Sequence, residues 1–134
     1  MKKIGVLLLL MASFASSAAS PYDSDLSALS GQIRSLTMYV DKSNSRASMI
    51  SVRQELLDIA KKLHRISEEA QSTNLSFLER GMQIDKSLNY ADNISKSLDL
   101  SAVMLDSYIQ TGDKNFMKFA KSQLDISRDM MSKQ

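Results

Sequence analysis

The side chains most capable of chemistry in this chain are few, and they centre on its one histidine. His64 precedes Glu68 by four residues, a spacing that places two side chains on the same face of a helix. An imidazole and a carboxylate so placed could share a metal ion. A stable zinc site needs three or four ligands, however, and the sequence has no cysteine and no second histidine to complete one. We therefore expect a surface pair between His64 and Glu68, and no metal site.

Catalytic and cofactor-binding patterns are not found in the sequence. Acid pairs such as Glu68–Glu69 and Asp23–Asp25 lie in mixed, polar sequence, without the apolar surroundings that raise a carboxyl pKa for acid–base work. Covalent haem attachment needs a Cys-x-x-Cys-His motif. The methionines that could oppose His64 on a non-covalent haem fall on or beside apolar stripes, where methionine fills gaps. We predict a protein that is not an enzyme and uses no cofactor.

The first residues have the three-part order of a bacterial-type secretory signal peptide. Lys2 and Lys3 precede the apolar run Ile4–Ala12. This run is too short for a transmembrane helix, because a span needs about 20 apolar residues. Small residues follow, and Ser17 and Ala19 suit the −3 and −1 positions of a cleavage site.

This order predicts cleavage after Ala19, with residues 1–19 as the signal peptide and residues 20–134 as one domain. The alternative is an uncleaved anchor from Ile4 to Ala19, which is disfavoured because serines interrupt its second half. No later stretch is apolar enough to cross a membrane, so we expect no transmembrane segment after the signal. The predicted location is the periplasm or the outside of the cell.

Charge and cysteine content exclude further classes of function. The formal charge of +2 includes Lys2 and Lys3, so it falls to zero when the signal is removed. Acids and bases alternate along the remaining chain, which is a poor electrostatic footprint for nucleic acid or an anionic membrane. We expect neither partner. The absence of cysteine removes disulfides and thiolate chemistry in an oxidising compartment.

Apolar residues after Pro21 recur every three or four positions, as on the buried face of a helix. Glycine and proline are too scarce for the frequent turns of a β-protein. The recurrence forms four stripes: Leu26, Leu29, Ile33, Leu36 and Val40; Met49, Val52, Leu56, Ile59, Leu63, Ile66 and Ala70; Ile84, Leu88, Ala91, Leu98, Ala102, Leu105 and Ile109; and Phe116, Phe119, Ile126 and Met130, broadened by Met117, Ala120 and Leu124. Ser95 fills the one small polar slot of the third stripe. The serine-rich face of that helix is interpreted as solvated, with close helix approach as the alternative.

Polar segments separate the stripes. The register slips across 41–46, polar residues interrupt at 71–74, and Ser76 with Glu79 has the spacing of a capping box. Gly112 suits the left-handed position that ends a helix, and Asp113 suits the next N-cap.

These breaks predict helices at about 23–42, 46–71, 75–111 and 113–132. Because the connections are short, the economical fold is an all-α, up-down antiparallel helical bundle. The third helix is the longest of the four. It either stays straight, which its unbroken apolar stripe favours, or kinks near 97–101, where Asp99 could cap a new segment.

The segment Tyr108–Phe119, with the sequence YIQTGDKNFMKF, resembles a recurring stretch of the periplasmic helical-bundle sensor modules of bacterial chemoreceptors and histidine kinases. In those modules an aromatic residue, a Thr-Gly-Asp corner and an apolar helix start join two helices. The modules lie between membrane-spanning helices, which are not expected here after the signal. The resemblance implies a detached bundle that binds a small molecule or docks on a membrane-bound partner. It identifies no binding residues.

The expected function is non-enzymatic binding of another protein, or self-association, through a helix face. Met38, Tyr39, Tyr90, Met104 and Tyr108 are large residues outside a single core stripe, and aromatic residues and methionine suit interface anchors. The alternative, that these five widen the core face, stays open. So do two other functions: a small-ligand sensor with a pocket between helices, and a periplasmic chaperone, which a basic concave face would favour.

Overall fold

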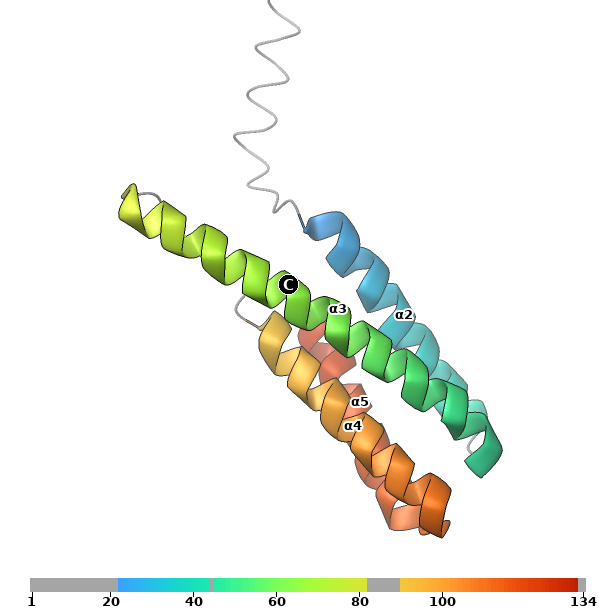
Figure 1. Cartoon of the computed structure of the whole chain (residues 1–134). Helices are drawn as coiled ribbons and strands as arrows, with labels where there is room; N and C mark the ends of the chain where they lie inside the picture. The colour runs from blue at the N-terminus through green and yellow to red at the C-terminus, as the bar shows by residue number, and fades with distance from the viewer. Residues whose placement is uncertain (1–21, 44, 82–89, 133–134) are drawn as a thin grey trace, which may run out of the picture.

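The computed structural model describes residues 22–43, 45–81 and 90–132. Within these ranges the chain forms four helices and no strand: α2 (Asp23–Lys42), α3 (Arg46–Glu79), α4 (Ala91–Thr111) and α5 (Lys114–Ser132). Figure 1 shows the helices packed side by side along their lengths. The predicted all-α helical bundle is confirmed.

Each helix runs antiparallel to the helix before it. At one end of the α3/α4 pair, the guanidinium of Arg46 donates to the carbonyl of Ile109 at 2.9 Å. Toward the other end, His64 of α3 lies beside Asp92 of α4. The helix α5 packs against both α4 and α2, so the bundle closes on itself. The up-down order expected from the short connections is therefore present.

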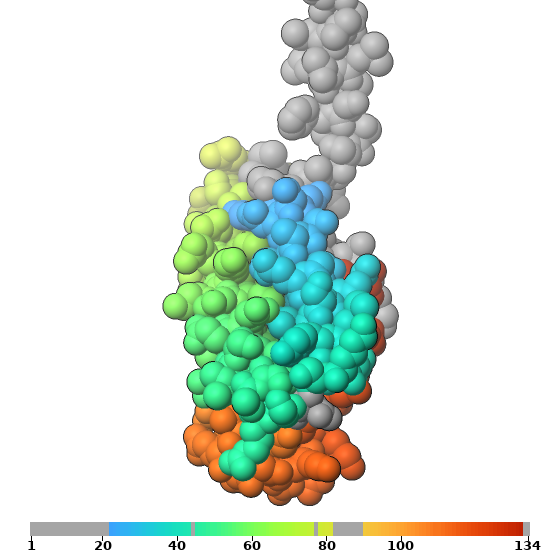
Figure 2. Space-filling view, turned by 90° about the vertical axis from the view of Figure 1, so that its right-hand side faces the viewer, coloured from blue at the N-terminus to red at the C-terminus, as the bar shows by residue number. Residues whose placement is uncertain are grey.

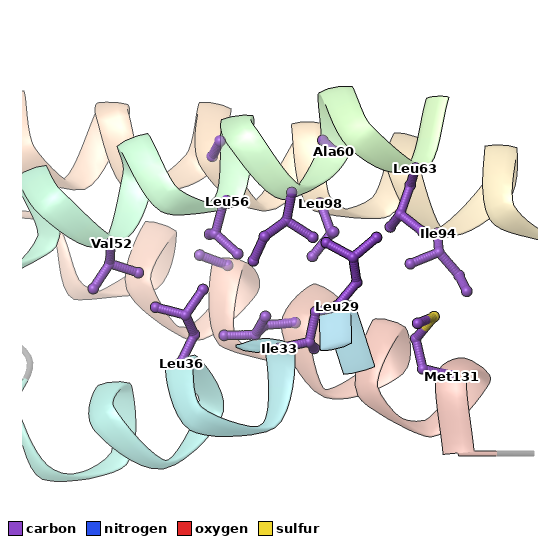
Figure 3. Close-up of a cluster of buried hydrophobic side chains, with 14 of the residues drawn as sticks. Leu29, Ile33, Leu36, Val52, Leu56, Ala60, Leu63, Ile94, Leu98 and Met131 are labelled. Atoms are coloured by element: carbon purple, nitrogen blue, oxygen red, sulfur yellow. The ribbon is translucent and has the colours of Figure 1, made fainter. Parts of the chain in front are cut away.

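The core lies where the apolar stripes predict it. Every residue of the first two stripes is buried, as are Ala91, Leu98, Ala102 and Leu105 of the third. Figure 3 shows Leu29 and Ile33 of α2 directed toward Leu56 and Leu63 of α3, with Leu98 of α4 between them. Burying one such side chain stabilises the fold by roughly 1.5–3 kcal/mol. Ile84 and Leu88 of the third stripe lie outside the described residues.

Two serines of α4 are part of the core rather than of a solvated face. The Ser95 hydroxyl donates to the carbonyl of Ala60 in α3 at 2.9 Å, and the Ser101 hydroxyl donates to the carbonyl of Ala120 in α5 at 2.8 Å. Both serines are buried. Their small side chains let neighbouring helices approach closely, and the hydrogen bonds satisfy the hydroxyls. Ser95 thus fills the small slot predicted for it in the third stripe, whereas the interpretation of Ser101 as part of a solvated face is wrong.

The face that α5 buries also differs from the prediction. Phe119 and Ile126 are exposed, whereas Met117, Ala120 and Leu124 are buried. The predicted stripe was centred on Phe116, Phe119, Ile126 and Met130. The helix instead turns inward the three residues that were predicted to broaden the stripe, and α4 approaches α5 closely at the carbonyl of Ala120.

The predicted boundary between the second and third helices is wrong. The helix α3 continues through 71–74 to Glu79, so Ser76 lies inside it and forms no capping box. The Thr73 hydroxyl donates to the carbonyl of Glu69 at 3.0 Å, which lets a polar residue sit in a helix. The long helix is therefore the second. The helix α4 begins at Ala91 and runs through 97–101 without a kink.

The far end of α3 projects beyond α4, as Figure 1 shows. The 34 residues of α3 span about 51 Å, whereas the 21 residues of α4 span about 32 Å. Leu75 and Leu78 in the projecting turns are 61% and 58% exposed. The excess length predicted for the third helix is thus carried by α3.

The joint between α4 and α5 has the predicted chemistry. Gly112 adopts a left-handed conformation with φ of 72° and ends α4. The Asp113 carboxylate accepts a hydrogen bond of 2.9 Å from the Asn115 backbone N–H, as an N-cap does. Arg46 closes the same end of the bundle by donating to the carbonyls of Ile109 and Gln110, both at 2.9 Å. These carbonyls have no partner within the helix, so α3 stabilises the end of α4.

Candidate functional site

Besides Leu75 and Leu78 in the projecting turns of α3, four large apolar side chains are exposed on α3 and α4. They are Ile50 and Leu57 of α3 and Leu100 and Val103 of α4, and together we call them the α3/α4 apolar strip. Ile50 and Leu57 are seven residues, or about 10 Å, apart on one helix face. Leu57 and Val103 line the same shallow hollow between the two helices. The strip therefore spans a helix–helix seam.

The strip exists because these helices carry more apolar residues than one buried face can hold. Leu56 is buried in the core, and the next residue, Leu57, is turned by about 100° toward the surface. The same relation holds for buried Ala102 and exposed Val103. Core packing does not account for Leu57 and Val103.

A polar bridge crosses the seam beside the hollow. The Arg53 guanidinium of α3 forms an ion pair with the Asp106 carboxylate of α4. The Gln110 side-chain amide donates to the other Asp106 oxygen at 2.8 Å. Because Arg53 and Asp106 are partly exposed, the pair contributes at most about 1 kcal/mol. Its greater consequence is a polar rim beside an apolar centre, the usual arrangement of a protein interface.

Two of the predicted partner-binding residues, Met38 and Tyr39, are exposed on α2. They are 54% and 43% exposed. As consecutive residues of a helix they point about 100° apart. Tyr39 lines a hollow together with Leu36 of its own helix and Val52 of α3. Neither residue lines the hollow that holds Leu57.

The other three predicted partner-binding residues lie against the core. Tyr108 is only 7% exposed, and Tyr90 and Met104 are partly buried and pack on the core cluster. Tyr90 also lines a hollow with Met131 near the end of α5. The five predicted residues thus come from two helices and the turn before α4, and they do not form one surface.

The residues of the α3/α4 apolar strip are not among the predicted partner-binding residues, although the sequence carries a signal for two of them. Leu57 and Val103 each follow a buried residue of a stripe. Adjacent residues of a helix point about 100° apart, so the second large residue of an apolar doublet can fall outside the buried face. At Leu57 and Val103 such a doublet coincides with an exposed apolar side chain, whereas Tyr108, a large residue, is buried.

His64 forms the predicted surface pair with Glu68 and gains a second carboxylate. Its Nε2 lies 3.1 Å from a Glu68 oxygen, and its Nδ1 lies 3.4 Å from an Asp92 oxygen. The pKa of Asp92 is lowered, chiefly by a hydrogen bond from Lys96 and less by His64. The two imidazole nitrogens face different carboxylates, so the three groups do not converge on one point. Among the described residues, no cluster of three such side chains could hold a metal ion.

No family model matches the chain, and comparisons with curated proteins and with solved structures give no match either. None of the helices in the described part of the chain has an apolar stretch long enough to cross a membrane. Function must therefore be inferred from the surfaces of the bundle itself.

Proposed function

We propose that this protein is a non-enzymatic binding protein of the periplasm or the extracellular space, and that it docks a face of its helical bundle on a protein partner. The α3/α4 apolar strip is the observation that carries the proposal. Exposed apolar side chains that gather on one surface and are edged by polar groups are typical of protein interaction sites. Leu57 and Val103 meet both conditions, since they line one hollow that Arg53 and Asp106 border, and Ile50 and Leu100 add exposed apolar surface on the same two helices.

The shape of the strip favours an amphipathic helix as the part of the partner that docks. Ile50 and Leu57 are separated by about 10 Å, which is the spacing of residues i and i+7 on a facing helix. The hollow between Leu57 and Val103 offers a seat for one apolar side chain. The Arg53–Asp106 pair borders that seat and can exchange hydrogen bonds with polar residues on the partner helix.

The proposed location is supported by the Lys-Lys, leucine-rich and Ser-Ala-Ala order of the first 19 residues. Amino-terminal sequencing of the exported protein should begin at Ser20 or Pro21. Recovery of only the full-length chain, in the membrane fraction, would contradict export with cleavage.

Site-specific photo-crosslinking in living cells tests the docking proposal. A photoreactive phenylalanine analogue at Val103 should capture one dominant protein, whereas the same analogue at exposed Lys118 of α5 should not. Leu57→Asp should abolish the product from position 103, because a charge cannot be desolvated without a partner. Equal capture at both positions, or no product at position 103, would overturn the proposal. A broad set of captured clients would favour the chaperone alternative instead.

A further inference from the structure

The groove between α2 and α3 is a second surface, separate from the α3/α4 apolar strip. Figure 2 shows α2 and α3 side by side along the face on which their seam lies. The groove has a volume of about 430 Å³ and a floor that includes Leu29 and Ile66. This volume lies in the range of clefts that hold small molecules, about 300–1,000 Å³. Polar and charged side chains form its walls.

The charges in the groove are separated along its length. At one end Tyr22 of α2 hydrogen-bonds Glu69 of α3; burial, and then the Glu69 charge, raises the pKa of this tyrosine. Asp25 lies one turn further along α2, so this end of the groove is acidic. Gln32 lies seven residues after Asp25, and Lys62 lies seven residues before Glu69. Since the two helices are antiparallel, the other end carries a cation and an amide.

These charged groups do not neutralise one another. Some charged residues of the bundle pair across helices, as Arg53 does with Asp106 and Lys121 does with Asp41. In the part of the chain that the structure describes, Asp25, Lys62 and Arg65 take part in no ion pair. An acid end and a base end thus face the same groove with their charges available to a ligand.

We propose that this groove binds an extended zwitterion of the class of a three-residue peptide. Its ammonium group lies at Asp25 and Glu69, and its carboxylate lies at Lys62 and Gln32. The seven-residue offset along each helix corresponds to about 10 Å. Three extended residues also span about 10 Å. Arg65, between the two ends, donates to a carbonyl of the bound chain.

This site does not depend on the proposed docking of a protein partner, because the groove and the strip lie on different seams of the bundle. The test is a calorimetric titration of the purified protein with trialanine. Saturable binding at one site is expected, with a Kd of about 1 mM or tighter. The tripeptide with an acetylated amino end and an amidated carboxyl end should bind at least tenfold more weakly, and so should free alanine. Equal affinity for the blocked peptide, or no saturation by trialanine, would overturn the proposal.

Matched variants locate the site. Lys62→Gln and Asp25→Asn should each raise the Kd for trialanine about tenfold, because each removes one charge-assisted contact. Lys61→Gln and Asp23→Asn make the same changes on the same helices without touching the groove, and they should leave the Kd unchanged. Circular dichroism checks that all four variants are folded. The proposal would be excluded if a control variant weakened binding as much as the matched groove variant, or if the groove variants bound trialanine normally.

Discussion

The hydroxyl of Ser95 donates a hydrogen bond of 2.9 Å to the main-chain carbonyl of Ala60, and this contact joins α4 to α3 inside the core. Both residues are buried, and both are small. The two helices can therefore approach each other closely at this point, with the Ser95 hydroxyl in direct contact with the α3 main chain.

The first prediction concerns that close approach. Ser95→Leu should lower the free energy of unfolding by about 1–3 kcal/mol, because three extra carbon atoms overpack a filled space. Ser95→Ala should cost about 1 kcal/mol or less, because the Ala60 carbonyl keeps its place in the α3 helix. Urea unfolding of the two variants measures the difference. Equal effects would show that volume does not matter here.

The second prediction concerns the end of α4. Gly112→Ala should destabilise the protein by about 1–2 kcal/mol, because an L-residue is strained at positive φ. Its methyl group would also lie 3.3 Å from the Arg46 guanidinium. Gly31→Ala is the control: that glycine lies inside α2 with nothing within 4 Å of an added methyl. It should stabilise the protein by about 0.5–1 kcal/mol. Thermal unfolding of both variants should show a lower melting temperature for Gly112→Ala and a higher one for Gly31→Ala.

The third prediction concerns pH. The pKa of Asp92 is lowered from its ordinary value of 3.8, first by the Lys96 hydrogen bond and then by His64. Its native contacts therefore contribute stability above pH 3.8, and this contribution is lost as the pH falls through the lowered pKa. Asp92→Asn should lower the free energy of unfolding by about 0.5 kcal/mol at neutral pH, the size of effect that a partly exposed ion pair gives. It should have no effect in strong acid, where the carboxyl group is protonated in the parent.

Unfolding free energies of the Asp92→Asn variant and the parent, measured across the acid range, test this pH dependence. Lys96→Gln is the companion variant, because it removes the largest cause of the shift. It should reduce the same pH dependence. A difference between parent and Asp92→Asn that stays constant with pH would refute the assignment.

The fourth prediction concerns the buried face of α5. Leu124→Ala should cost about 2–5 kcal/mol, because it leaves a cavity at a fully packed site. Phe119→Ser removes a larger side chain but should cost about 0.5 kcal/mol or less, since Phe119 is 45% exposed. If Phe119 faced the core, as the sequence-based stripe expects, Phe119→Ser would cost at least as much as Leu124→Ala. Chemical unfolding decides between them.

The sequence predicts the helical class and the buried faces of α2, α3 and α4. Apolar residues at every third or fourth position lie on one face of a helix, and that face is the one that packs in the core. It does not predict the end of α3. Polar residues at 71–74 suggest a break, yet Thr73 satisfies its hydroxyl within the helix. Polar residues weaken a helix but do not by themselves end it. No proline, which would end the helix, follows these residues.

The face of α5 and the candidate site depend on distances between helices, which a single sequence does not contain. Phe119 and Ala120 are both apolar, and only the approach of Ser101 shows which of them is covered. Leu57 and Val103 likewise become a surface only when α3 and α4 lie side by side.

Because α5 packs against α2, the first and last helices of the bundle lie close together. The start of α2 and the end of α5 line one hollow, where Leu26 and Met131 meet. The contacts that hold the bundle are side-chain contacts between neighbours in a ring, and they do not depend on which loop is open. A circular permutant that links the end of α5 to the start of α2 by a short glycine–serine segment, and opens the chain between Gly112 and Asp113, should keep the same core. Its helices would then be encoded in the order α5, α2, α3 and α4.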